Sequence, residues 1–168
     1  EIYIEVARDE ERPFYIHSGE VTVEVLGTSF SVRSYPEDEQ VRVVVDSGLV
    51  SFERTDGDEG LKLEPMQSGT YSYTSGHFIR SQIDDPELFL GWTKGFLKFQ
   101  DTPLNQVIRE LERRYNVNLE LASPSIGEKL LTATLKGREI QNVLDVIATA
   151  LSLDYFSNED GSITFSVS

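Results

Sequence analysis

An apolar pattern that occurs twice, 36 residues apart (Leu104 to Ile140), constrains this chain more than any other feature. The first copy has apolar or aromatic residues at Leu104, Val107, Ile108, Leu111, Tyr115, Val117 and Leu119. The second copy has them at Ile140, Val143, Leu144, Ile147, Leu151, Leu153 and Tyr155. The first five positions of each copy share one face of an α-helix, and the last two have strand spacing. The pattern therefore predicts two amphipathic helices, each followed by a strand.

A short apolar segment also precedes each predicted helix, at residues 96–99 and 131–135. Thr102 suits the N-cap of the first helix, because its hydroxyl can accept a hydrogen bond from a first-turn N–H. Pro103 suits the first helical position, where a missing N–H costs nothing. The other face of this helix is predicted to be solvated and carries Asn105, Arg109, Glu110, Glu112, Arg113 and Arg114.

Each copy is thus predicted to form a strand, a helix and a strand, which is a βαβ unit. Residues 153–157 and 163–167, joined by a turn at 158–161, predict a closing hairpin. Two copies are too few for a solenoid. We therefore expect an α+β domain in which both helices cover one face of a single sheet.

The first half of the chain alternates between apolar and polar residues with the period of a β-strand. Clear examples are Val21, Val23 and Val25, which alternate with Thr22 and Glu24. Short strands that alternate in this way and are separated by polar turns predict an all-β domain, which is a roll, a sandwich or a solenoid. Alternation alone does not choose among the three.

The pattern changes between residues 81 and 91, where an acidic stretch with Pro86 is followed by an apolar segment that ends at Trp92. We interpret this stretch as a linker and a short anchoring segment between the two halves. The predicted domains are residues 1–85, all-β and truncated at its N-terminus, and residues 86–168, α+β.

The net charge of −14 comes from 29 acids and 15 bases. Such a surface repels phosphate backbones and anionic lipids, so nucleic-acid binding is disfavoured. The chain has no cysteine, which excludes disulfides, thiolate metal sites and cysteine nucleophiles. No apolar run approaches the length of a membrane-spanning helix, so this segment is not expected to cross a bilayer.

No constellation of residues predicts catalysis, and no cofactor is expected. The two histidines, His17 and His77, lie in separate β-segments without a carboxylate at metal-ligand spacing. Residues 56–60 begin like a calcium loop, but Leu61 stands where an EF-hand needs glycine, so a hairpin turn is favoured. The sequence predicts a protein that is not an enzyme.

Exposed strand edges and apolar side chains of the second half are the remaining candidates for function, because main-chain pairing and apolar patches both bind partners. The candidate partner-binding residues are Trp92, Leu119, Leu121, Tyr155 and Phe156. One alternative is a glycan-binding module in which Trp92, Tyr71 and Tyr73 form an aromatic platform. A second alternative is an envelope-assembly domain, since such domains also contain small βαβ units.

Three stretches together resemble one family. Two of them are similar to the core of FecR-type anti-sigma factors: residues 12–14 (RPF) with 21–35 (VTVEVLGTSFSVRSY), and residues 41–52 (VRVVVDSGLVSF). Residues 91–115, from GWTKGFLKF to LERRY, resemble the opening of the C-terminal domain of that family. Ser31 departs from the usual Asn, and residues 66–69 are a loose version of the usual turn.

The resemblance implies the periplasmic part of a single-pass inner-membrane regulator of a Gram-negative bacterium. Its C-terminal domain would resemble the secretin/TonB short N-terminal signalling domain, and would contact the signalling domain of a TonB-dependent outer-membrane receptor during nutrient uptake. An extracytoplasmic-function sigma factor would be controlled through a cytoplasmic segment that the present sequence lacks. The receptor, the signal and the sign of regulation are left open.

Overall fold

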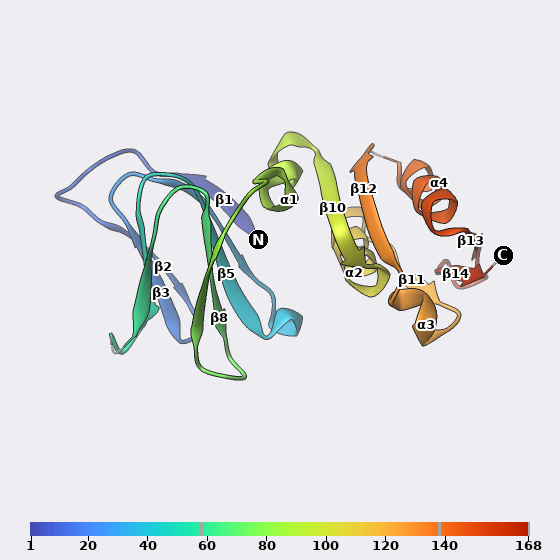
Figure 1. The fold of residues 1–168 in the computed structure, drawn as a ribbon, viewed down its shortest axis with the longest axis horizontal. Helices are drawn as coiled ribbons and strands as arrows, with labels where there is room; N and C mark the ends of the chain where they lie inside the picture. The colour runs from blue at the N-terminus through green and yellow to red at the C-terminus, as the bar shows by residue number, and fades with distance from the viewer. Residues whose placement is uncertain (58, 138, 168) are drawn as a thin grey trace. The chain divides into compact units, whose positions relative to one another are not determined.

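The computed structural model describes residues 1–57, 59–137 and 139–167. The chain divides into two compact units, Glu1–Pro86 and Glu87–Ser168, and each is described by itself below (Figure 1). No helix within the described ranges combines the length and the apolar character needed to cross a membrane.

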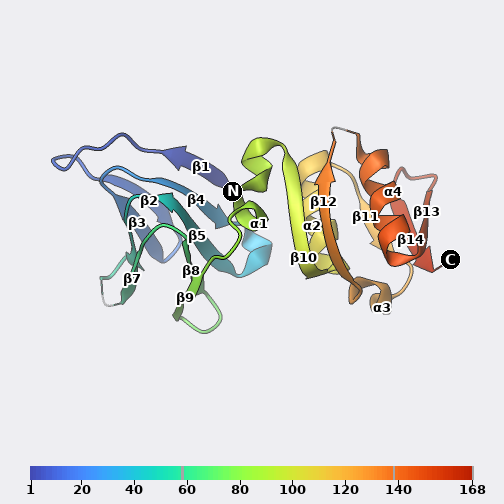
Figure 2. The ribbon, with the colours of Figure 1, turned by 45° about the horizontal axis from the view of Figure 1, so that its top comes forward.

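The first unit consists of antiparallel strands in two sheets (Figure 2). The five-stranded sheet has the order β1-β4-β5-β8-β9 and the four-stranded sheet the order β2-β3-β6-β7. The strands are β1 (Ile2–Glu5), β2 (Phe14–Ser18), β3 (Val21–Val25), β4 (Ser29–Ser34), β5 (Gln40–Ser47), β6 (Val50–Arg54), β7 (Gly60–Leu63), β8 (Gln67–Ser72) and β9 (Phe78–Gln82). A short 3₁₀ helix, η1 (Pro36–Asp38), joins β4 to β5.

The period-two alternation turns one side of each strand toward a single core. Val21, Val23 and Val25 of β3 are buried, whereas Thr22 and Glu24 between them lie on the outer side. Both sheets contribute to this core, whose buried members are Val21, Val23, Val25, Phe30, Val32, Val41, Val43, Val45, Val50, Phe52, Leu63 and Tyr71. Of the three arrangements that the alternation allowed, the structure has the two-sheet sandwich.

The predicted hairpin turn near residues 56–60 joins two paired strands. β6 and β7 are antiparallel, and Glu53 lies opposite Gly60. Asp56 accepts hydrogen bonds from the Arg54 guanidinium, at 2.8 Å from Nη2. Asp58, which formed part of the prediction, lies outside the described residues. A hairpin turn rather than a calcium loop therefore accounts for this segment.

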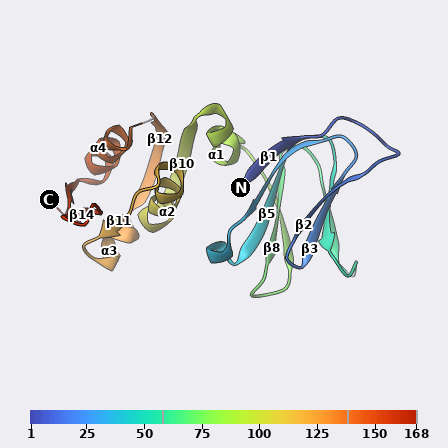
Figure 3. The ribbon, with the colours of Figure 1, turned by 180° about the vertical axis from the view of Figure 1, so that it is seen from behind.

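The second unit repeats a strand, a helix and a strand, as the sequence predicted (Figure 3). The first copy is β10 (Phe96–Pro103), α2 (Leu104–Tyr115) and β11 (Leu119–Leu121), and the second is β12 (Leu130–Lys136), α4 (Ile140–Leu151) and β13 (Leu153–Ser157). The strand β14 (Ile163–Val167) pairs antiparallel with β13, so the predicted closing hairpin is confirmed. The remaining helices are α1 (Glu87–Leu90), η2 (Gly91–Lys94) and α3 (Pro124–Gly127).

The prediction of one sheet with both helices on one face is wrong. The strands form two separate sheets, an antiparallel pair β10-β12 and a three-stranded sheet β11-β14-β13. The strands of each copy therefore belong to different sheets, and α4 contacts both β12 and β13. The core is shared by both copies, because Leu104, Val107 and Leu111 of α2 lie in one buried cluster with Val143 and Ile147 of α4.

The predicted start of α2 is also wrong, by one residue. β10 continues to Pro103, with an irregularity between Phe99 and Thr102, and Pro103 occupies the N-cap position. Asp101 at this irregularity has φ of 45°, a left-handed conformation. The Thr102 hydroxyl donates to the carbonyl oxygen of Gln100 instead of capping the helix. Pairing with β12 therefore replaced the capping geometry that the local sequence favoured.

Candidate partner-binding surface

The five candidate partner-binding residues differ strongly in exposure. Phe156 on β13 is 52% exposed, whereas Leu119 on β11 is 6% exposed and belongs to the core. Leu121 and Tyr155 are partly buried and pack against that core. Trp92 in η2 is also partly buried, and its Nε1 has no acceptor among the described residues. Phe156 is therefore the one large apolar side chain of the five that is mainly open to solvent.

The two outer strands of the three-stranded sheet, β11 and β13, differ as sites for main-chain pairing. β11 has three residues, and the Leu119 N–H that points away from the sheet donates to Glu112 Oε1 at 3.0 Å. The sequence had placed Glu112 on the solvated face of α2, but it is half-buried and caps this edge. The edge of β11 is thereby partly blocked.

The direction of the β13 main-chain groups follows from the bonds of its neighbour β14. The Ile163 N–H donates to the Asn118 carbonyl at 3.0 Å, and the Phe165 carbonyl accepts from the Ala122 N–H, so both residues face β11. Successive residues of a strand alternate in direction, so Thr164 and Ser166 face β13 and pair with Phe156 and Asp154.

By the same alternation, Tyr155 and Ser157 direct their main-chain groups away from β14. β13 is an outer strand of its sheet among the described residues, and it has five residues. We call these outward main-chain groups, of Tyr155 and Ser157, the open edge of β13. An added strand would find its hydrogen-bond partners there.

The side chains of β13 divide between two faces. Tyr155 lies on the helix side, where its hydroxyl donates to Asp145 of α4 at 2.6 Å and its ring lies 5.9 Å from that of Phe165. The hydrogen bond to Asp145 raises the pKa of Tyr155, and partial burial raises it further. Asp154 and Phe156 lie on the opposite face and are exposed. This contact of Tyr155 fixes the strand on α4.

The turn between β13 and β14 is held by its own polar residues. Asn158 N–H donates to the Ser162 carbonyl at 2.8 Å, and Asp160 accepts from the main-chain N–H and the hydroxyl of Ser162 at 2.9 and 2.8 Å. These hydrogen bonds hold the pKa of Asp160 below its ordinary value. Hydrogen bonds within this turn therefore hold the end of β13 in place, and no partner protein is needed for it.

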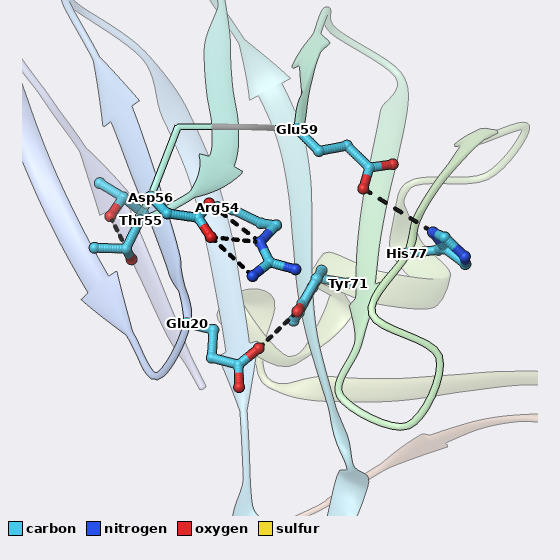
Figure 4. Close-up of polar contacts among 8 residues, drawn as sticks. Glu20, Arg54, Thr55, Asp56, Glu59, Tyr71 and His77 are labelled. Carbon is cyan, nitrogen blue, oxygen red and sulfur yellow. Dashed lines mark hydrogen bonds and ion pairs between the residues drawn. The ribbon is translucent and has the colours of Figure 1, made fainter.

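In the first unit, polar contacts gather where β3, β6 and β8 meet (Figure 4). The buried Tyr71 donates through its hydroxyl to Glu20 at 2.7 Å, and this hydrogen bond raises its pKa. His77 Nδ1 lies 4.0 Å from a Glu59 carboxylate oxygen. These contacts join strand ends and turns of the first unit.

The aromatic platform considered for glycan binding is not formed by Tyr71. Its side chain is 0% exposed and meets Tyr73 edge-on, with the ring centroids 5.6 Å apart. A sugar could reach only Tyr73 of this pair, which is 38% exposed. Among the residues that the structure describes, no three His, Cys, Asp or Glu residues converge as metal ligands.

A hollow of about 570 Å³ lies on the first unit, where the β3–β4 and β5–β6 connections meet. The exposed Leu26 and Leu49 border it, and residues of both charges surround them. Arg8 and Glu10 at its rim form an ion pair at 2.6 Å. The mixed lining identifies no particular ligand.

The chain thus has the fold of a two-sheet β unit followed by a duplicated strand-helix-strand unit whose copies share one core. Comparison with known proteins gives the family. Residues 1–51 match the model of the FecR protein family, and residues 96–165 match the model of the FecR C-terminal domain. A search of curated proteins gave no match.

Two solved structures of a proposed anti-sigma factor from Parabacteroides distasonis ATCC 8503, at 1.65 and 2.50 Å resolution, are similar to this chain. Both are 28% identical to it, with TM-scores of 0.82 and 0.81, and the alignment covers 99% of this chain and 76% of the solved chains. The chain belongs to the FecR family of anti-sigma factors, a regulatory family without enzymatic activity.

Proposed function

We propose that this chain is the periplasmic signal-relay region of an inner-membrane anti-sigma factor. Its second unit contacts the signalling domain of a TonB-dependent outer-membrane receptor, and this contact controls an extracytoplasmic-function sigma factor. The family assignment supports the regulatory role. A strand with an open edge, here β13, supports a binding rather than a catalytic role for the second unit.

The observation that carries the receptor contact is the duplicated strand-helix-strand unit with a closing hairpin, spanning β10 to β14. Its C-terminal family match covers residues 96–165, which is nearly this whole unit. The first unit has a core of its own, which contains no residue of the second.

Isothermal titration calorimetry of the full chain with the signalling domain of its own receptor tests this function. We expect saturable binding of a transient kind, with an interface of under about 1,200 Å². The signalling domain of a receptor that is not encoded beside this regulator is the control. Absence of heat and of co-elution with the true partner would contradict the proposal, and stable rings of this chain alone would favour an envelope-assembly role instead.

A further inference from the structure

The two copies of the duplicated unit differ in the charge of their helices. α2 carries five charged residues, Arg109, Glu110, Glu112, Arg113 and Arg114, and two of them form an ion pair, with Arg113 Nη2 2.8 Å from Glu110 Oε1. α4 carries one, Asp145, which already accepts from Tyr155. The exposed positions of α4 include Val146, 45% exposed, and Ala150. A helix with a single charged residue therefore adjoins β13, whereas a helix with five adjoins β11.

The two edge strands of the three-stranded sheet also differ, in whether a helix carboxylate caps their outward main-chain groups. Glu112 of the charged helix caps the outward N–H of Leu119, so β11 is partly blocked by its own copy. In the second copy Asp145 binds the side chain of Tyr155, and its carboxylate leaves the outward main-chain groups of that strand uncapped. Of the two outer strands, β13 therefore has the main-chain groups that remain available for pairing with another strand.

The sequence segment that contains β13 carries acids and no basic residue, and one base from outside it, Lys129, reaches it by donating through Nζ to the Leu151 carbonyl at 3.1 Å. Residues 139–168 contain no Lys, Arg or His, and their acids are Glu139, Asp145, Asp154, Glu159 and Asp160. Asp154 and Phe156 stand two positions apart on the exposed face of β13. In a neighbouring strand, the side chains directly opposite these two would lie about 4.5–5.5 Å away at Cβ.

We infer that the open edge of β13 pairs with an extended strand of a partner protein that carries Lys or Arg and an apolar residue two positions apart on one face. The basic residue lies opposite Asp154 and the apolar residue opposite Phe156. A basic side chain can also stack on the Phe156 ring. This inference rests on the proposed function and specifies the chemistry of the partner strand. A strand with acids at these positions would be repelled.

Nuclear magnetic resonance titration of the full ¹⁵N-labelled chain tests the edge without any receptor. The probe is a blocked heptapeptide, Thr-Lys-Thr-Val-Thr-Lys-Thr, and its counterpart has glutamate in place of both lysines. We expect saturable shifts centred on the amides of Tyr155 and Ser157, and affinity about tenfold higher for the lysine peptide. Shifts centred on β11, shifts spread over the whole acidic surface, or equal binding of both peptides would overturn the inference.

Three variants sharpen the test. Ser157→Pro removes an outward N–H that an added strand would need, so it should abolish the shifts. The pairing of β13 with β14 should survive, because that N–H does not pair with β14. Asp154→Lys should reverse the preference between the two peptides, and it tests the edge even where the proline variant does not fold. Glu64→Lys makes the same charge change at an exposed site of the first unit and should leave peptide binding unchanged. If the wild type forms dimers and the Ser157→Pro variant does not, a second copy of this chain occupies the open edge of β13, and the assignment to a basic partner strand is overturned.

Titration with the receptor signalling domain separates this inference from the proposed function. Equal affinity of that domain for the wild type and for Asp154→Lys would overturn the edge assignment and leave the receptor contact intact. Absence of receptor binding by the wild type, together with specific peptide binding at β13, would overturn the receptor contact alone.

Discussion

Shortening Leu144 to alanine should destabilise the second unit without destabilising the first. Leu144 lies in the middle of α4, is 0% exposed, and packs in a core whose members all come from residues 99–165. The substitution removes three carbon atoms, worth about 2.4 kcal/mol in transfer free energy at about 0.8 kcal/mol each. The cavity that remains adds to this, so we expect a loss of about 3–4 kcal/mol.

Hydrogen–deuterium exchange of the full chain, followed by mass spectrometry, measures this loss in each unit separately. For β10 to β14, the protection of the slowest amides should fall by about two to three powers of ten, since 1.4 kcal/mol corresponds to tenfold. For β3, β5 and β6 it should stay unchanged, because their core contains no residue of the second unit. Val146→Ala on the same helix, at a position 45% exposed, is the matched control and should cost under about 0.5 kcal/mol.

The reciprocal variant Val43→Ala should lower protection in the first unit only, because Val43 is 0% exposed within the other core. Equal losses in both units after either substitution would refute the argument that each unit is stabilised by its own core. A Leu144→Ala effect as small as that of Val146→Ala would refute the packing of α4.

Three further predictions concern single contacts. Gly69→Ala should cost about 1–3 kcal/mol in chemical denaturation of the first unit, because a Cβ there would lie 2.8 Å from a core leucine carbon; unchanged stability would contradict this packing. Glu112→Ala should cost about 1 kcal/mol of second-unit stability by leaving the Leu119 N–H without its acceptor, and Glu112→Gln, which keeps an acceptor oxygen, should cost less. Burial and the hydrogen bond to Asp46 raise the pKa of Tyr3 to about 12. The contribution of Tyr3 to stability is therefore complete below about pH 10 and is lost between about pH 10 and 12. Tyr3→Phe should flatten this part of the stability–pH profile, and an unaltered profile would refute the assignment.

The elements of this chain followed largely from its periodicity. The stripes on α2 and α4 and the alternation on β3 each record which side of an element avoids water, and a single segment suffices to show it. The closing hairpin followed in the same way, because its turn residues lie between two strands that are neighbours in sequence. Membership of a regulatory family likewise rested on motifs that local sequence displays.

The pairing of strands distant in sequence could not be obtained in this way. That β10 pairs with β12 and not with a strand of its own copy depends on how two helices share one core, and each local pattern fits either arrangement. The same pairing extended β10 through Thr102 and displaced the predicted helix cap. Propensity at that site is worth about 1 kcal/mol, less than the strand pairing and packing that replaced it.

The sequence by itself therefore determined the strands and helices, the acidity around residues 139–168 and the absence of cysteine chemistry. Only the tertiary structure decided that Tyr71 and Leu119 are buried, that Glu112 partly blocks the edge of β11, and that β13 keeps an open edge. The physical reason is that burial and edge exposure are properties of neighbours brought together across the chain, whereas periodicity reports only the two sides of one segment.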